Sequence, residues 1–203
     1  MDIVKPTFKL VRDKLRKATF AEMVIVFTIA AVIGYFIETG YVFLTIGKLV
    51  KRGFLLGPYC PIYGFGALIL YYCFYEVKPS FKNIPSIFII SSIILGSFEL
   101  LCGLGFKYIL DLEMWNYSGQ FLNIMDYTTV PILIGWGILG TLYVFFIHQL
   151  ILKIVDLFPK QAINKIAIIL VLVFLCDWSI SEYRINKNPQ ILENLVNPQN
   201  IVK

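Results

Sequence analysis

Long runs of apolar residues are the feature that most constrains the fold of this chain. Five such runs divide the sequence, each near the roughly 20 residues that a helix needs to cross about 30 Å of hydrocarbon. They cover Thr19–Gly47, Phe54–Val77, Pro85–Leu110, Thr128–Leu152 and Asn164–Ser181. Backbone polar groups find no water inside lipid, and the runs do not alternate between polar and apolar residues, so helices are expected rather than strands. The sequence therefore predicts an all-α integral membrane protein with five transmembrane helices.

The composition excludes an ordinary soluble domain. Hydrophobic residues make up 58% of the 203 residues and charged residues 15%, against roughly 45–50% and 25% in typical globular chains. The four cysteines show no CxxC spacing, so neither a disulfide framework nor a metal site is predicted. We predict one polytopic transmembrane domain over residues 19–183, between a basic N-terminal segment (1–18) and a polar C-terminal tail (184–203).

The distribution of basic residues predicts the orientation in the membrane. With the N-terminus inside, eleven Lys and Arg residues face the cytoplasm and seven face the other side. Cytoplasmic segments carry the excess of positive charge in membrane proteins. The chain is therefore predicted to lie in the cell membrane with a cytoplasmic N-terminus and an external C-terminus. Membrane topology and contact with anionic lipids account for the basic N-terminal segment (1–18), which we also call the basic leader, so no nucleic-acid partner is expected.

The second apolar run is interrupted by helix-breaking residues. The interruption contains Gly57, Pro58, Cys60, Pro61, Tyr63 and Gly64. Proline removes a helical hydrogen bond and clashes with the preceding turn. The first third of this run is therefore predicted to be re-entrant or unwound, as in the discontinuous helices with which transporters expose backbone groups to substrates.

A weak internal similarity relates the first two runs to the next two. Gly34–Glu38 in the first run corresponds to Gly96–Glu99 in the third, and Pro61–Gly66 in the second to Pro131–Gly140 in the fourth. Both pairs would enter the membrane in the same sense, which indicates a parallel two-helix repeat. The alternative is independent use of glycine for close helix packing.

Charged residues within the apolar runs are the main candidates for function. A charge at the bilayer centre costs about 2.5–3.5 kcal/mol on insertion scales. Glu38 and Glu99 lie inside the first and third runs, and Arg52 precedes the second. In the predicted orientation all three belong to the outer half of the membrane, together with the loop that carries Trp115, Asn116 and Asn123. One interpretation is a polar chamber in which Arg52 binds an anionic group. The other is an internal ion pair that holds the helices in register.

The remaining polar and aromatic residues of the apolar runs are predicted to be structural. Asp177 lies inside the fifth run and, like Glu38 and Glu99, falls in the outer half of the membrane, but its place near Glu182 and Arg184 favours an interfacial residue over a site residue. His148 is expected to be a hydrogen-bonded packing residue. The tryptophans are expected in aromatic belts at the membrane surface: Trp115, Trp136 and Trp178.

The run Arg52–Gly66 (RGFLLGPYCPIYGFG) resembles the hallmark of the ABC-transporter type IV (CmpB-like) family of small bacterial membrane proteins. The resemblance covers roughly residues 30–145 and extends in order to Glu38, Glu99 with Gly103, Trp115–Ser118, Asn123 and Trp136–Gly137. The chain departs from the family at Asn116, where Asp is usual, and at Met125–Tyr127, where glycine and a basic residue are usual. The resemblance implies a permease-like component that works with a separate ATPase subunit.

Three functions remain open at this point. The first is a permease-like component whose polar site uses Arg52, Glu38 and Glu99. The second is a non-catalytic accessory or assembly subunit in which these charges pair internally. The third is an intramembrane enzyme for a lipid or lipid-linked substrate, with a buried glutamate as general base. The sequence lacks the GxxxxGK[ST], GxSxG and HExxH motifs, which weighs against an enzyme, and it predicts no cofactor. Five helices enclose little space for a transport path, which favours the accessory subunit unless the protein forms a homo-oligomer.

Overall fold

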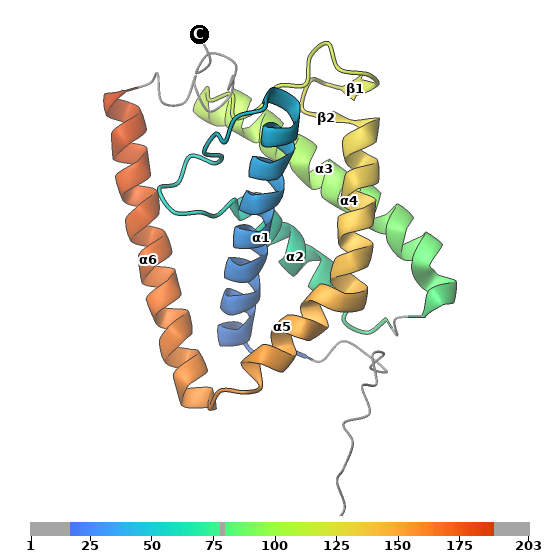
Figure 1. Cartoon of the computed structure of the whole chain (residues 1–203), viewed down its shortest axis with the longest axis vertical. Helices are drawn as coiled ribbons and strands as arrows, with labels where there is room; N and C mark the ends of the chain where they lie inside the picture. Colours follow the sequence, from blue (N-terminus) through green and yellow to red (C-terminus); the bar gives the residue numbers. More distant parts are fainter. Residues whose placement is uncertain (1–16, 78–79, 189–203) are drawn as a thin grey trace, which may run out of the picture.

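The computed structural model describes residues 17–77 and 80–188, which form an almost entirely helical protein (Figure 1). In chain order the elements are α1 (Phe20–Ile46), α2 (Pro61–Phe74), a 3₁₀ turn (Phe81–Asn83), α3 (Ile84–Leu110), β1 (Asn123–Ile124), β2 (Thr128–Thr129), α4 (Val130–Leu142), a π-helical segment (Tyr143–Ile147), α5 (His148–Val155) and α6 (Lys160–Lys187). The two strands form a short antiparallel hairpin. Most of the predicted basic leader, and the tail from residue 189 onward, lie outside the described residues. The predicted all-α membrane fold is confirmed.

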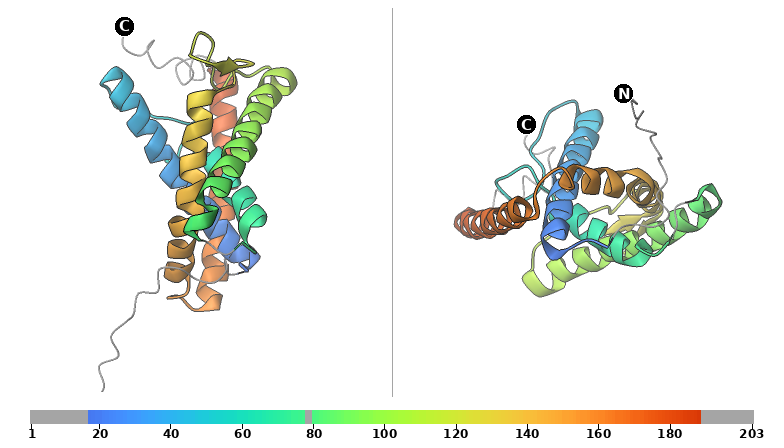
Figure 2. Two further views of the ribbon diagram at one scale, coloured as in Figure 1. Left: turned by 90° about the vertical axis from the view of Figure 1, so that its right-hand side faces the viewer. Right: turned by 90° about the horizontal axis from the view of Figure 1, so that it is seen from below.

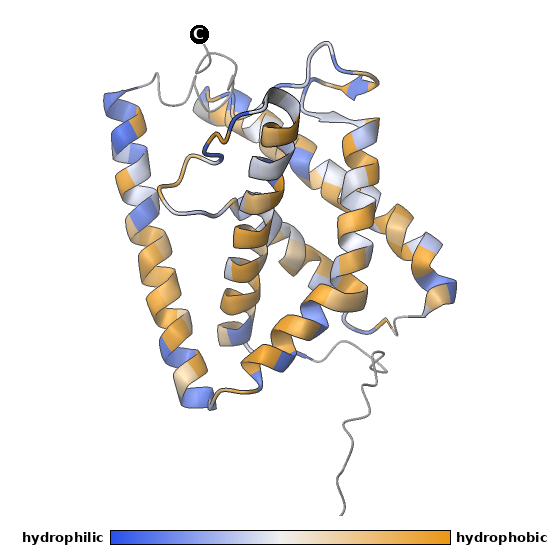
Figure 3. Ribbon diagram, viewed as in Figure 1, coloured by the Kyte–Doolittle hydropathy of each residue, from blue (hydrophilic) through white to orange (hydrophobic). Residues whose placement is uncertain are grey.

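In the part of the chain that the structure describes, four helical stretches are long and apolar enough to cross a membrane. They are Phe20–Thr45, Phe81–Ile109, Val130–Val155 and Lys160–Lys187. Apolar residues dominate the middle of these helices, and hydrophilic residues gather towards their ends (Figure 3). By contrast, α2 has 14 residues and is about 21 Å long at a rise of about 1.5 Å per residue. The number of spans stays a prediction, because α2 alone is shorter than the roughly 30 Å of a bilayer core.

The helix ends follow from local sequence. α1 begins with a capping box, in which the Thr19 side chain accepts from the Glu22 N–H and the Glu22 carboxylate accepts from the Thr19 N–H. It ends at Gly47, whose left-handed conformation (φ 71°) closes the helix at little steric cost. α4 begins with Thr129 as its N-cap and has proline in its first turn. α6 continues to Lys187 and so includes the first four residues (184–187) of the predicted polar tail.

The helices pack mainly as two neighbouring pairs. α1 contacts α2 extensively, and α3 contacts α4. This is the pairing that a two-helix repeat predicts. Side chains of α1, α2 and the α4–α5 region form a shared core that includes Val26, Leu70, Val144 and Leu152. α6 lies at the periphery beside α1 (Figures 1 and 2).

The C-terminal halves of α1 and α3 diverge towards the same end of the molecule, where the hairpin lies (Figure 2). The start of α1 and the end of α6 lie at opposite ends (Figure 1). Residues 48–60, which we call the re-entrant segment, return from the end of α1 without forming a helix. The segment ends where the Cys60 N–H donates to the carbonyl of Ala31, 2.9 Å away in the middle of α1. The predicted break of the second run is therefore present, and the helix starts at Pro61.

Candidate functional site

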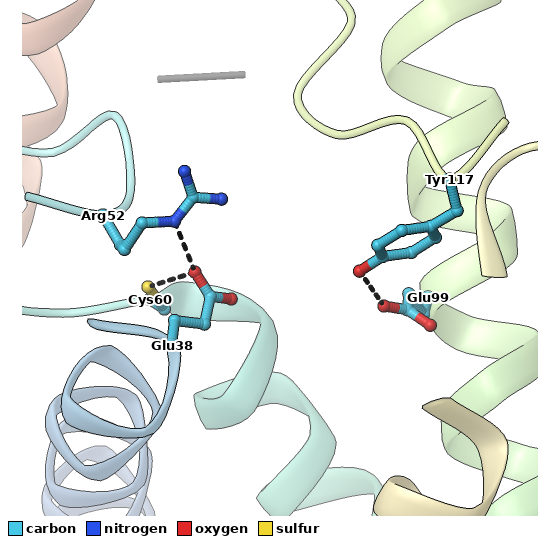
Figure 4. A network of polar contacts seen from close by, with 5 residues as sticks. All are labelled: Glu38, Arg52, Cys60, Glu99 and Tyr117. Carbon is cyan, nitrogen blue, oxygen red and sulfur yellow. Dashed lines mark hydrogen bonds and ion pairs between the residues drawn. The ribbon is translucent and has the colours of Figure 1, made fainter. Parts of the chain in front are cut away.

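The first half of the candidate site is a charged group on α1 and the re-entrant segment. Nε of Arg52 lies 3.8 Å from Oε2 of Glu38, and the Cys60 thiol lies 3.5 Å from the same oxygen. The two terminal nitrogens of Arg52 point away from Glu38 (Figure 4). Charge-assisted N–H···O bonds typically measure about 2.7–2.9 Å. The 3.8 Å contact is therefore an ion pair rather than a tight hydrogen bond.

The second half of the site is a hydrogen-bonded carboxylate on α3. Glu99 accepts from the hydroxyl of Thr128 at 2.8 Å, from the indole N–H of Trp136 at 3.2 Å and from the hydroxyl of Tyr117 at 3.3 Å. These donors come from the hairpin, α4 and the loop that precedes the hairpin. The Glu99 side chain is 5% exposed. The network therefore supplies a buried carboxyl group with three hydrogen-bond donors, which offsets part of the cost of removing it from water.

The two halves face one another (Figure 4). The ring of Tyr63, in the first turn of α2, packs against Trp136 at an interplanar angle of 43° with centroids 5.1 Å apart. Burial, together with the negative charges of Glu99 and Glu38, raises the pKa of Tyr117 above its usual value, so this phenol remains a neutral donor. The arrangement combines two carboxyl groups, one guanidinium and an aromatic wall.

The structure places the predicted site residues in two environments. It brings Glu38, Arg52 and Cys60 into contact, and Glu99 faces them from α3. The other three predicted residues lie in the loop and hairpin between α3 and α4: Trp115, Asn116 and Asn123. Trp115 donates to the Tyr127 carbonyl at 3.0 Å, and Asn116 bonds within the exposed turn to Glu113 and Ser118. Asn123 is exposed in β1. These side chains shape the loop rather than contact either glutamate.

The donors to Glu99 were not among the predicted site residues. Trp136 is 7% exposed and donates to Glu99, so its predicted place in an aromatic belt is wrong. Its position at the end of the second turn of α4, away from the start of the helix, is the sequence signal that separates it from an interfacial residue. Tyr117 and Thr128 carry no such signal, because only the folded loop brings them to α3.

The other residues singled out by sequence have structural partners. His148 is 1% exposed and its Nδ1 lies 2.8 Å from the hydroxyl of Tyr143, as expected of a packing residue. Asp177 is 8% exposed and binds the re-entrant segment rather than the membrane surface. Among residues 17–77 and 80–188, no group of three or more His, Cys, Asp or Glu side chains could hold a metal ion.

Comparison with known proteins gives one match. No curated protein and no solved structure matches the chain. A family model described as "Putative ABC-transporter type IV" matches residues 25–182. The match includes α1 from its second turn onward, the re-entrant segment, both halves of the site and most of α6. The chain is thus a membrane protein of a transport-related type and belongs to this ABC-transporter type IV family.

Proposed function

We propose that the chain is a permease-like component of a transport system and that the two facing halves of the site bind the transported compound. Arg52 binds an anionic group of the substrate, while Glu38 and Glu99 act as gating or proton-linked acids. The observation that carries this proposal is the position of Arg52. The group formed by Arg52 and Glu38 faces the Tyr117–Glu99 group across the site (Figure 4).

The re-entrant segment supports a binding role. It brings non-helical backbone to the middle of α1, where Cys60 bonds to Ala31 and α2 begins. Irregular backbone at membrane depth is tolerated where protein buries it or where it lines a cavity, and transporters use such breaks for their substrate sites. The break between α1 and α2 therefore lies beside the residues that we assign to the substrate.

An apolar cavity continues from the site into the helix bundle. It has a volume of about 60 Å³ and is lined by side chains of α1–α4, including Tyr63 and Trp136. From these two rings it extends away from Cys60 and Thr128, along α2 and α4, as far as Leu70 and Ile147. The Tyr63–Trp136 pair therefore lies between the polar site and the cavity, the position expected of a constriction in a transport path.

The energy source is proposed to be a separate ATPase subunit. The sequence contains no GxxxxGK[ST] motif, the loop with which P-loop ATPases bind phosphates. Purification of the tagged chain in mild detergent, followed by mass spectrometry, tests for this partner. A stoichiometric ATPase supports the permease assignment, whereas its absence together with a tightly held lipid favours a stand-alone lipid carrier or enzyme.

The orientation is part of the proposal. The basic leader predicts a cytoplasmic N-terminus. The start of α1 and the end of α6 lie at opposite ends of the molecule, so the end of α6 would then lie on the outer side (Figure 1). With this orientation the site opens to the outer half of the membrane. Reporter fusions at the two termini test it, since reporters active on the same side would contradict it.

The transport role is tested by comparing cells with and without the gene. Untargeted mass spectrometry of cells and medium should show compounds whose distribution between the two changes while their covalent structures do not. Arg52→Ala should abolish that change at normal membrane abundance. Lys48→Ala is the matched control, because Lys48 is an exposed basic residue at the start of the same segment. If cells with the Arg52→Ala protein show the same distribution of compounds as cells with the parent protein, the assigned site is refuted. Newly formed covalent species would indicate an enzyme instead.

A further inference from the structure

A single carboxylate on α6 binds the backbone of the re-entrant segment. Oδ1 of Asp177 accepts from the N–H of Leu56, and Oδ2 accepts from the N–H of Gly57, both at 2.7 Å. The hydroxyl of Tyr59 donates to Oδ2 at 2.6 Å. The hydroxyl of Ser181, one turn further along α6, donates to Oδ1 at 2.8 Å. Four donors therefore converge on Asp177, and three of them belong to the re-entrant segment.

These bonds satisfy backbone N–H groups that have no helical partner in the re-entrant segment. Leu56 and Gly57 have no helical carbonyl to which their N–H groups could donate, and a buried polar group without a partner costs about 1–3 kcal/mol. Asp177 satisfies two consecutive N–H groups at once. Lys51 adds a bond from its amine to the Leu56 carbonyl at 2.7 Å. The conformation of the segment near Leu56 thus depends on a residue more than 100 positions away in the sequence.

The segment held in this way forms one side of the polar site. It carries Arg52, whose Nε reaches Glu38, and it ends at Cys60. Gly53 adopts φ 75°, and a Cβ built on it would lie 3.4 Å from Sγ of Cys60. The Cys60 side chain is 3% exposed. Gly53 thus packs against this thiol, which lies directly beside Glu38.

We propose that Asp177 is a latch that holds the re-entrant segment over the polar site and thereby positions Arg52 against Glu38. α6 packs mainly against α1 and exposes most of its remaining surface. The latch is a polar link between α6 and the segment that carries Arg52. Release of the latch uncovers Cys60 and Glu38, so a displacement of α6 opens the site. The effect of the latch on transport rests on the proposed function, whereas the latch itself does not.

Cys60 provides a direct reporter of the latch. Replacing Cys73, Cys102 and Cys176 by alanine leaves Cys60 as the single thiol of the full chain. The purified protein is treated with N-ethylmaleimide, and the modified fraction is followed by intact mass. A buried thiol reacts through local opening, so its rate reports the free energy of that opening. Asp177→Asn leaves one acceptor oxygen and turns an NH₂ group towards backbone donors. We expect labelling about tenfold faster or more.

Matched variants show whether the effect belongs to the latch. Glu182→Gln removes a neighbouring carboxylate of α6 that is exposed, and labelling should stay slow. Tyr59→Phe removes one donor and leaves the carboxylate, so an intermediate rate is expected; this milder variant serves if Asp177→Asn fails to fold. Equal rates in the parent, Tyr59→Phe and Asp177→Asn proteins would overturn the latch.

Chemical rescue separates a latch from general loosening of the structure. Asp177→Gly leaves a space in which formate can accept the same hydrogen bonds. Sodium formate should restore slow labelling of Cys60, and sodium chloride at the same concentration should not. Fast labelling that formate leaves unchanged would overturn the proposal, because it would mean that hydrogen bonds to a carboxylate do not hold the segment.

The transport consequence is measured separately, with the cell-and-medium comparison described above. Asp177→Asn should reduce transport, whereas Glu182→Gln, which changes an exposed carboxylate of the same helix, should leave it unchanged. If Asp177→Asn accelerates Cys60 labelling without changing transport, the latch stands and the proposed transport site fails.

Discussion

The ring of Tyr63 in α2 occupies the space that a side chain on Gly34 of α1 would fill. A Cβ atom at Gly34 would overlap Cβ and Cγ of the tyrosine, the near end of the side chain, which cannot swing aside. Gly34 therefore permits the close approach of α1 and α2. The same approach places Tyr63 against Trp136, whose indole N–H donates to Glu99. Gly34 thus affects the site indirectly, because it sets the position of the Tyr63 ring.

Gly34→Ala should destabilise the protein by about 1–3 kcal/mol, the usual cost of overpacking a close contact. Thermal unfolding of the purified protein in detergent measures this effect. Gly40→Ala is the matched control, because it lies on the same helix and a Cβ added there would meet no neighbouring side chain or element within 4 Å. There alanine should be neutral or stabilising by up to about 1 kcal/mol. Equal stability of the two variants would contradict the close packing of Tyr63 on Gly34.

Glu99→Leu should destabilise the chain more than Glu99→Gln. Leucine leaves the buried donors of Thr128 and Trp136 without their acceptor, at about 1–3 kcal/mol for each group. Glutamine keeps one carbonyl oxygen and should lose less. Unfolding in detergent compares the two variants with Glu182→Leu, which removes an exposed carboxylate on α6. If Glu99→Leu is as stable as the Glu182→Leu control, the network around Glu99 does not stabilise the fold.

Sequence predicted the helices better than the contacts between them. The apolar runs predicted α1, α3 and α6 because lipid requires long, internally bonded segments, and Pro61 predicted where α2 could begin. The hydrogen-bond partners of individual side chains are harder to predict from sequence. Trp136 was assigned to the membrane surface because tryptophan is common there, yet its N–H serves a buried acid. Asp177 binds backbone N–H groups about 120 residues away, and no local pattern encodes such a contact.

A charge reversal distinguishes a substrate-binding Arg52 from a purely structural one. Glu38 and Arg52 form an ion pair at 3.8 Å. Either single change, Glu38→Arg or Arg52→Glu, replaces this pair by two like charges and should lower the stability of the protein. The double variant restores opposite charges and should recover most of the lost stability. If Arg52 binds an anionic group, transport should stay abolished in the double variant, since the positive charge has moved to α1. Recovery of both stability and transport would support the accessory-subunit alternative.

Two residues of the loop between α3 and α4 test how far the site extends. Asn123 is exposed in β1, so Asn123→Ala should leave transport and membrane abundance unchanged. Trp115→Phe removes the indole bond to the Tyr127 carbonyl but keeps an aromatic ring against Phe106. Because Tyr117 belongs to the same loop and donates to Glu99, loosening the loop should reduce transport partially. The cell-and-medium comparison measures both variants. Loss of transport with Asn123→Ala at normal abundance would show that the substrate also contacts the hairpin, and an unaffected Trp115→Phe protein would show that the loop does not control the site.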